Sequence, residues 1–445
     1  MLRAYKYALN PTPRQARFLD GHCGAARKAF NWGLARVKAV MDQRSAEASY
    51  GIPDQLLTPA ISWSMYSLRK AWNRAKSDVA PWWAEYSKEA YASGLTQLAT
   101  ALKNWADSRK ARRGGRSVGF PRFKSKRTAV RSCRLTTGVI RCDERYAVLP
   151  RIGRMRLHET PAPELLDGTA RILAATIRFE RGRWFVSFTV EQDTPVRAPD
   201  RPDAVVGVDL GIKSLAVMAE PDGEPHTVPN LKHLDTSLRK LGKLSRRVSR
   251  RVGPDRRTGR VPSNRWKRAN GQRNRVHHRV AYQRADALHK FTSAIAAEYG
   301  TVVVEDLNVA GMLKNKRLAR RVGDAGFGEI RRQLAYKTEW NGGRLVVADR
   351  WFPSSKTCSG CGVVKAKLLL SERLYVCESC GLVMDRDENA ARNLAALAVA
   401  ASGAETLNGR GADQKTRATG QVAVKRLPGS PQHQTGTALP KAGSV

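Results

Sequence analysis

The stretch YVCESCGLVMDRDENAARNL, residues 375–394, decides the fold, and we expect the rest of the chain to be arranged around it. It joins half of a paired-cysteine motif to a knot of acidic residues: Cys377, Cys380, Asp385, Asp387 and Glu388. The acidic knot opens an apolar segment with helical spacing. Asp385 and Glu388 have the spacing of a capping box, and we assign them the role of starting this helix. A metal-binding knuckle and a group of carboxylates are therefore expected side by side.

Two CxxC pairs predict a zinc site. Cys358 and Cys361 are followed, after fifteen residues, by Cys377 and Cys380, which is the spacing of a four-thiolate zinc ribbon. Each pair lies in a knuckle, CSGCG or CESCG, whose glycine permits the tight turn that brings both sulfurs to one ion. A closed shell of four thiolates leaves no position for water, so this zinc is expected to be structural. A redox role is the alternative, and the matching glycines favour zinc.

Two further acids follow strands that look buried: Asp209 in AVVGVDLGIKS and Glu305 in TVVVEDLN. A single acid after an apolar strand is more often a turn or cap residue than a ligand. Three clustered carboxylates, however, repel one another unless a cation lies between them. Hard oxygen ligands suit Mg²⁺, and phosphodiester cleavage favours two such ions about 4 Å apart. Together with an acid of the knot at 385–388, these residues predict a magnesium site and a nuclease.

Composition points to a polyanionic partner. The chain has 445 residues, of which 42% are hydrophobic, so two to four globular domains are expected. Lys and Arg total 79 against 39 Asp and Glu, a formal charge of +40, which matches a surface that neutralises many phosphates. There is no transmembrane run and no apolar signal core after Met1, so no membrane partner is predicted. Seven cysteines, four of them in CxxC pairs, favour a reducing, cytoplasmic location.

The first half of the chain predicts a strand, a helical block and then several strands. Residues 2–8 alternate, whereas apolar residues recur at helical spacing over 19–37 and 63–110. From Cys133 to Glu191 the period changes to two, which indicates a small antiparallel barrel. Such barrels often bind oligonucleotides, although a structural role is equally open. Since the first strand precedes the helical block, that block is expected to be an insertion into the barrel.

The second half predicts a mixed α/β sheet, because strands alternate with helices. Apolar strands are expected at 204–208, 214–218, 301–304 and 344–348. Amphipathic helices are expected at 231–248, 263–299 and 326–341, and again from Asp385. The tail from about residue 401 shows no sustained period and is predicted to be disordered. The whole chain is therefore expected to be a multidomain α+β protein.

Two basic stretches are candidate nucleic-acid contacts, with a merely solvated face as the alternative in each. Residues 109–131 pack cations around glycines and Pro121, with Phe120 and Phe123 interleaved, as in surfaces that track a backbone and stack bases. Residues 239–284 hold 17 Lys or Arg and one acid. The candidate contacts are Arg112, Arg113, Arg116, Arg122, Lys124, Lys126, Arg246, Arg250, Lys267 and Arg275.

Several motifs resemble the TnpB family of transposon-encoded proteins, relatives of the type V CRISPR effectors. The C-terminal motifs are DLGIK at 209–213, VVVEDLN at 302–308, SSKTCSGCG at 354–362, CESCG at 377–381 and DRDENAARN at 385–393. NPTPRQ at 10–15, RKAFNWGL at 27–34 and GFPRFKSK at 119–126 are also similar to family segments. The resemblance covers residues 1 to about 400.

The resemblance implies a domain arrangement. It implies an RNase H-like (RuvC) α/β nuclease domain with an inserted zinc ribbon, preceded by a small wedge-type oligonucleotide-binding β-barrel that carries a helical recognition insertion. The corresponding residues are 1–9 and 113–196 for the barrel, 10–112 for the helical insertion, 203–350 and 382–400 for the nuclease domain, 351–381 for the zinc ribbon, and 401–445 for the disordered tail.

The resemblance also implies an activity, its cofactors and its partners. It implies an RNA-guided DNA endonuclease whose catalytic magnesium ligands are Asp209, Glu305 and Asp387. Two Mg²⁺ ions, a structural Zn²⁺ and a guide RNA from the transposon end would be its cofactors. Double-stranded target DNA would be its substrate, with a short target-adjacent motif read by the protein, which acts as a monomer or a homodimer. A DNA- or RNA-binding transposon regulator without guided cleavage, and a transposase or its accessory protein, are the alternatives.

Overall fold

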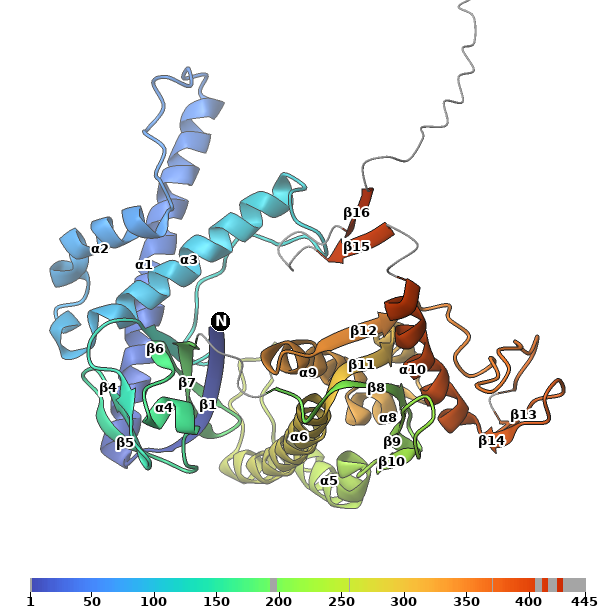
Figure 1. Ribbon diagram of the computed structural model, residues 1–445. Coiled ribbons are helices and arrows are strands. Elements are labelled where there is room, and N and C mark those ends of the chain that lie inside the picture. Colours follow the sequence, from blue (N-terminus) through green and yellow to red (C-terminus); the bar gives the residue numbers. More distant parts are fainter. Residues whose placement is uncertain are drawn as a thin grey trace, which may run out of the picture. The chain divides into compact units, whose positions relative to one another are not determined.

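The computed structural model describes residues 2–192, 198–255, 257–369, 371–404, 410–414 and 422–426, with side chains described up to residue 400. The chain divides into two compact units, Met1–Thr194 and Pro195–Val445. Both units combine helices with sheets, as the mixed pattern of the sequence predicts (Figure 1).

The first unit contains one seven-stranded antiparallel sheet of order β2-β6-β7-β1-β5-β4-β3. Its strands are β1 (Leu2–Asn10), β2 (Ser132–Leu135), β3 (Arg141–Cys142), β4 (Tyr146–Leu149), β5 (Gly153–Leu157), β6 (Arg171–Glu180) and β7 (Arg183–Glu191). The first strand pairs with β7 and β5, which come from the end of the unit. The helices between β1 and β2 therefore form an insertion between two strands of one sheet. Closure of this sheet into a barrel stays a prediction.

The helices of the first unit are α1 (Pro13–Ser49), α2 (Met65–Val79), the short 3₁₀ helix η1 (Trp83–Glu85), α3 (Lys88–Arg109) and α4 (Pro163–Leu166). The α1 helix begins with a capping box: the Thr12 hydroxyl accepts from the Gln15 N–H, and the Gln15 side-chain oxygen accepts from the Thr12 N–H. It packs directly on α3, where a Cβ at Gly94 would lie 2.0 Å from the Ala26 carbonyl oxygen. Glycine is therefore required where these two helices meet.

The second unit contains a five-stranded mixed sheet of order β10-β9-β8-β11-β12. Its strands are β8 (Arg201–Leu210), β9 (Ser214–Ala219), β10 (His226–Pro229), β11 (Tyr299–Glu305) and β12 (Arg344–Ala348). The strands β8, β11 and β12 run parallel, and β9 and β10 are antiparallel to their neighbours. The predicted mixed sheet is thus confirmed.

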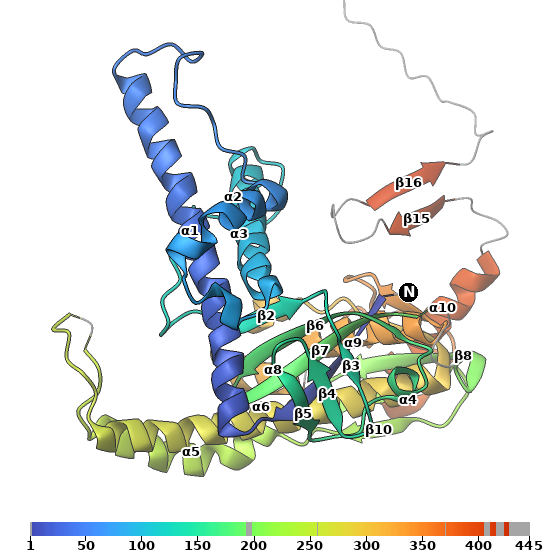
Figure 2. The ribbon, with the colours of Figure 1, turned by 90° about the vertical axis from the view of Figure 1, so that its left-hand side faces the viewer.

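Helices cover both faces of this sheet (Figures 1 and 2). The helices of this unit are α5 (His233–Ser249), α6 (Asn264–Glu298), α7 (Val309–Met312), α8 (Ala319–Ala325), α9 (Phe327–Trp340) and α10 (Arg386–Ala404). Residues of α6, α7, α8 and α9 pack on one face and α10 on the other, whereas α5 packs on α6. Val302 and Val304 of β11 face a core that includes Phe327 and Leu334, whereas Val303 between them faces Leu394 of α10. Burial on both faces explains why β11 reads as a continuous run of apolar residues rather than an alternating one.

The α10 helix lies very close to β8. A Cβ at Gly207 would stand 1.9 Å from the Ala391 carbonyl oxygen, so only glycine allows this approach. The helix therefore carries its first turn to a fixed place relative to the strand that ends in Asp209.

Between β12 and α10 the chain forms a small module that contains β13 (Leu374–Val376) paired antiparallel with β14 (Val383–Asp385). Past α10, β15 (Arg410–Gln414) pairs with β16 (Val422–Arg426). The predicted disorder of 401–445 falls mostly outside the described residues. Within the described part of the chain, no helix is long and apolar enough to cross a membrane.

Candidate metal centres

The four cysteine sulfurs meet in the small module. The Sγ atoms of Cys358, Cys361, Cys377 and Cys380 all lie within 4.8 Å of one another. The Cys358–Cys380 and Cys361–Cys377 sulfur pairs are each 3.6 Å apart. A tetrahedral zinc ion with Zn–S bonds of about 2.3 Å separates its sulfurs by about 3.8 Å. The thiol set therefore fits zinc in both chemistry and spacing, as the sequence predicts.

The two cysteine knuckles are built alike. The Gly362 N–H donates to the Cys358 carbonyl over 2.9 Å, and the Gly381 N–H donates to the Cys377 carbonyl over 3.0 Å. Both glycines have left-handed backbones, with φ of 77° and 75°, which side chains disfavour. In the second knuckle, backbone N–H groups of Cys380 and Ser379 lower the pKa of the Cys377 thiol to about 6. This geometry prepares a thiolate for a metal ion.

The sheet of the second unit brings two of the predicted acids together. Asp209 is near the end of β8, and Glu305 ends β11. These strands are parallel neighbours in which Val208 pairs with Val304, so the acids that follow leave the sheet at the same edge. Asp387 lies in the first turn of α10, the helix that packs against β8.

The pKa of Asp209 responds to the charges of both other acids. Burial raises the pKa of Asp209 to about 8, with further contributions from the negative charges of Glu305 and Asp387. Asp385 adds to the rise, and Arg386 opposes it. A cation beside Asp209 would favour its ionised form. The oxygens of these acids form a hard donor set of the kind that holds Mg²⁺.

Ser354 and Arg373, which sequence reasoning did not single out, support two of these acids. The buried Ser354 hydroxyl donates to Glu305 Oε1 over 2.5 Å. The Arg373 guanidinium lies 3.8 Å from Asp387 Oδ2. Ser354 belongs to the motif SSKTCSGCG, but the motif alone gives no sign that its hydroxyl reaches a strand 49 residues earlier.

Two buried asparagines of α10 tie the helix to the first cysteine knuckle. Asn389 donates to the Thr357 carbonyl over 2.6 Å and accepts from the Ser359 N–H over 2.9 Å. Asn393 donates to the carbonyls of Ser354 and Thr357, each over 2.7 Å. The zinc module and the carboxylate edge are thereby joined through one helix. Sequence reasoning missed both residues.

The predicted capping box at α10 is half right. Asp385 Oδ1 accepts from the backbone N–H groups of Asp387 and Glu388, over 2.8 and 3.4 Å, so Asp385 caps the helix. The predicted reciprocal role of the Glu388 side chain in the capping box was wrong. Its carboxylate pairs with Arg392, one turn later, over 3.1 Å, because a guanidinium at this spacing offers a charge-assisted hydrogen bond.

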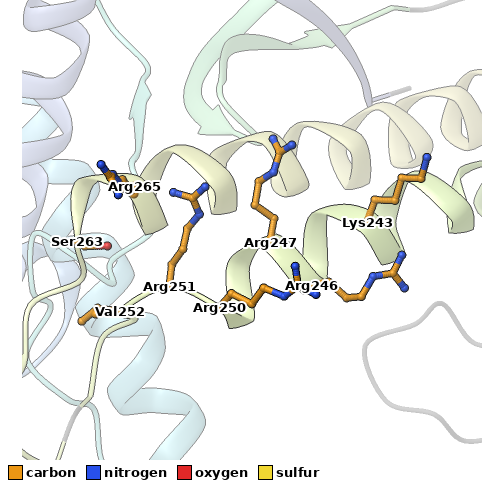
Figure 3. Close-up of a pocket in the computed structure, with 8 residues that line it drawn as sticks. All are labelled: Lys243, Arg246, Arg247, Arg250, Arg251, Val252, Ser263 and Arg265. Carbon is orange, nitrogen blue, oxygen red and sulfur yellow. The ribbon is translucent and has the colours of Figure 1, made fainter.

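The predicted basic surface of the second unit lines a groove. The α5 and α6 helices form a hairpin, and a cavity of about 700 Å³ lies where they are connected. Figure 3 shows the residues that line it: Lys243, Arg246, Arg247, Arg250, Arg251, Val252, Ser263 and Arg265. The candidates Arg246 and Arg250 are among them, whereas Lys267 and Arg275 are exposed further along α6.

In the first unit, most candidate contacts are exposed and one is not free. Arg112, Arg113, Arg116, Arg122 and Lys126 are exposed on the segment after α3. The Lys124 ammonium, by contrast, lies 3.8 Å from the centre of the Phe30 ring and donates to Gln97 Oε1 over 2.5 Å. Burial lowers its pKa to about 8. Lys124 therefore packs the segment against α1 and α3, and its role as a nucleic-acid contact stays a prediction.

Three family models match the chain. They are described as "probable transposase" for residues 187–316, "Cas12f1-like, TNB domain" for 327–394 and "helix-turn-helix domain" for 1–45. The last range holds β1 and most of one continuous helix, α1. The first two matches span the carboxylate edge and the cysteine module. The fold and site therefore define a protein of the transposase-related class that carries a four-cysteine module.

Full-length relatives identify the family. The chain is 40% identical to a Mycobacterium tuberculosis protein named as a candidate RNA-guided DNA endonuclease, over 93% of this chain and 91% of the relative. It is 35% identical to a Streptomyces pristinaespiralis protein of the same name, over 96% of both. A solved complex of Cas12f1 with guide RNA and target DNA aligns with a TM-score of 0.48 at 12% identity, over 89% of this chain and 98% of that one. The chain belongs to the TnpB family, as its motifs predict.

Proposed function

We propose that this protein is a Mg²⁺-dependent, RNA-guided DNA endonuclease that hydrolyses phosphodiester bonds at one RuvC-like site. The observation that carries the proposal is the placement of Asp209 and Glu305 at the same end of two adjacent parallel strands, with Asp387 in the first turn of the helix that packs on β8. The charges of Glu305 and Asp387 add to the raised pKa of Asp209. The second unit would be an RNase H-like domain, residues 203–350 and 382–400, interrupted by a zinc ribbon at 351–381. The strand order and the paired cysteine knuckles support this assignment.

The first unit would be a wedge-type barrel with a helical recognition insertion. The pairing of β1 with β7 supports this assignment, because residues 10–112 then lie between two strands of the same sheet. The exposed arginines that follow α3 would contact the phosphate backbone.

The chain's own residues set up the chemistry. Asp209, Glu305 and Asp387 would hold two magnesium ions, which supply an activated water and a Lewis acid at the leaving 3′ oxygen when bound. Burial, and then the charges of Glu305 and Asp387, raise the pKa of Asp209, and a bound cation would favour its ionised form. The Ser354 hydroxyl orients Glu305, and the asparagine contacts of α10 fix the helix that carries Asp387.

Guide RNA and target DNA are proposed from the named relatives together with charge. A formal charge of +40 suits a complex that holds a long nucleic-acid backbone. The groove between α5 and α6 would track phosphates without reading bases. Base pairing with the guide would supply most of the sequence specificity, and the protein would read a short motif beside the target.

The test starts from the RNA that copurifies with the protein. Its sequence defines a matched target plasmid, on which the wild-type complex is expected to cut in the presence of MgCl₂ and not in EDTA. Asp209→Ala, Glu305→Ala and Asp387→Ala should each abolish cutting and leave DNA binding largely intact. Asp286→Ala, on an exposed site of α6 paired with Lys290, is the matched control and should cut normally. Wild-type cutting by any triad variant would refute the assignment.

A DNA-joining transposase is a second candidate, because one matching family model is described as "probable transposase". It would use the same metal site. Strand transfer of a transposon-end duplex without any guide RNA would favour it. A regulator that only binds nucleic acid would show neither cutting nor transfer.

A further inference from the structure

Trp351 exposes a large aromatic ring at the sheet edge that carries the acids. Its side chain is 84% exposed, although the next residue, Phe352, packs against the core beneath α10. An indole exposed to water contributes none of the hydrophobic free energy that its burial would add to stability. An exposed aromatic ring on a turn of defined backbone offers a platform on which a nucleic-acid base can stack.

The backbone around Trp351 is fixed by hydrogen bonds to Asp349. The Trp351 N–H donates to Asp349 Oδ1 over 2.8 Å, and the Phe352 N–H donates to the Asp349 carbonyl over 3.0 Å. These bonds form a tight turn directly after β12. The indole is thus presented on a turn of defined shape.

Residues on each side of Trp351 contact the end of β11 and the residue that follows it. Arg350 pairs with the Asp306 carboxylate over 2.6 Å, and Ser354 donates to Glu305. In the sheet, Glu305 pairs with Ala348, three residues before Trp351. The turn that contains Trp351 is therefore held at both ends by hydrogen bonds, to Glu305 at one end and to Asp306 at the other.

We propose that Trp351 is a stacking site for a nucleobase of the DNA strand being cut, next to the scissile phosphate. The proposal rests on the proposed nuclease function. A rigid, exposed aromatic ring accepts any base, because every base has a flat π face. Stacking would hold the strand in the geometry that the metal site needs. Lys213 and Arg373 line one groove, and Arg373 lies 3.8 Å from Asp387 Oδ2; both would contact the phosphates.

A nucleobase fits this surface better than a protein does. The exposed residues just before Trp351, Asp349 and Arg350, are charged, and the residue after it, Phe352, packs against the core. Protein interfaces need a contiguous area with an apolar centre. A single base needs only one ring and nearby positive charge.

The experiment compares three variants in the complex with guide RNA and target DNA. Trp351→Ala and Trp351→Leu should lower the cleavage rate by about tenfold, within the range measured for loss of one stacked base. Trp351→Phe keeps a ring and should retain most of the rate. All three should melt like the wild type, because an exposed side chain contributes little to stability. A Trp351→Phe variant as slow as Trp351→Ala would overturn the stacking role.

Abasic nucleotides separate stacking from a structural effect. Placed one at a time along the cut strand, an abasic site should slow the wild type at one position near the cut. At that position Trp351→Ala should show no further loss, since ring and base act as one pair. If the wild type and Trp351→Ala respond equally to every abasic position, the proposal is wrong.

Photocrosslinking tests the contact without cleavage. Asp209→Asn complexes with 5-iodouracil near the cut should crosslink to residue 351 at one position, and a strand that crosslinks elsewhere contradicts the proposal. If the wild type cuts no DNA at all, the proposed function fails, while this crosslink still decides the stacking site. A change in oligomeric mass in Trp351→Ala, with the abasic response unchanged, would assign the indole to self-association and overturn the proposal.

Discussion

Replacing Asp209 by asparagine is expected to stabilise the metal-free protein while removing its activity. The folded protein holds the pKa of Asp209 at about 8, through burial and then through the charges of Glu305 and Asp387. An unfolded chain returns the group to its ordinary pKa of about 3.9. Folding therefore disfavours the ionised form of this carboxyl, which lowers the stability of the wild type at neutral pH. The asparagine amide has the same shape but does not ionise, so the variant has no such loss of stability.

The pKa difference sets the size and sign of the effect. Because the folded pKa is raised, the native state binds the extra proton, and stability falls as pH rises between about 4 and 8. Each pKa unit corresponds to about 1.4 kcal/mol, so the upper limit of the cost is about 6 kcal/mol. Side-chain relaxation at a partly exposed site lowers this limit. We expect about 2 kcal/mol at pH 8, or about 4–8 °C in the melting temperature of the second unit.

The assay is thermal unfolding of the wild type and Asp209→Asn in a buffer that removes Mg²⁺ and leaves the zinc thiolates loaded. The difference between the two melting temperatures should grow from pH 6 to pH 8, because only the wild type carries the titrating group. Adding MgCl₂ should raise the melting temperature of the wild type and have a smaller effect on the variant, since the metal loses a ligand.

Two results would refute this reasoning. One is an Asp209→Asn protein that melts below the wild type at pH 8 without Mg²⁺. The other is a melting-temperature difference that is constant across the pH range. Either would mean that burial and the neighbouring charges do not raise the pKa of Asp209 in the folded protein. The matched control is Asp286→Asn, an exposed acid on α6 whose replacement should change neither the melting temperature nor its pH dependence.

Three further perturbations test the surrounding structure. Cys358→Ser should lose zinc, measured by metal analysis, and give little folded protein; a soluble, zinc-free and active variant would contradict a structural role. Ser354→Ala should fold normally and cut DNA about tenfold more slowly, because Glu305 loses a fixed hydrogen bond; an unchanged rate would show that the serine does not orient it. Asn389→Ala should lower the free energy of unfolding by about 1–3 kcal/mol, since the Ser359 N–H and the Thr357 carbonyl lose their buried partner; chemical denaturation measures it, and no change would contradict this contact.

Local sequence patterns predicted much of the second unit. Period and apolar runs located strands such as β8 and β11, because strands buried on both faces need continuous apolar residues. The paired CxxC spacing predicted the thiol cluster, since two short knuckles with glycines can close on one ion in only a few ways. Cations were harder to interpret. Lys124 has the same local pattern as its exposed neighbours and yet packs on Phe30.

The sequence by itself determined the kinds of element, the four clustered thiols and the acids available for metal binding. These features depend on residue type and on short spacings. Only the tertiary structure decided which side chains support those acids. The bonds from Ser354 to Glu305 and from Asn389 to Thr357 join residues that are 49 and 32 positions apart. Such contacts arise from the register of parallel strands and the close approach of α10 to Gly207, and no local pattern encodes them.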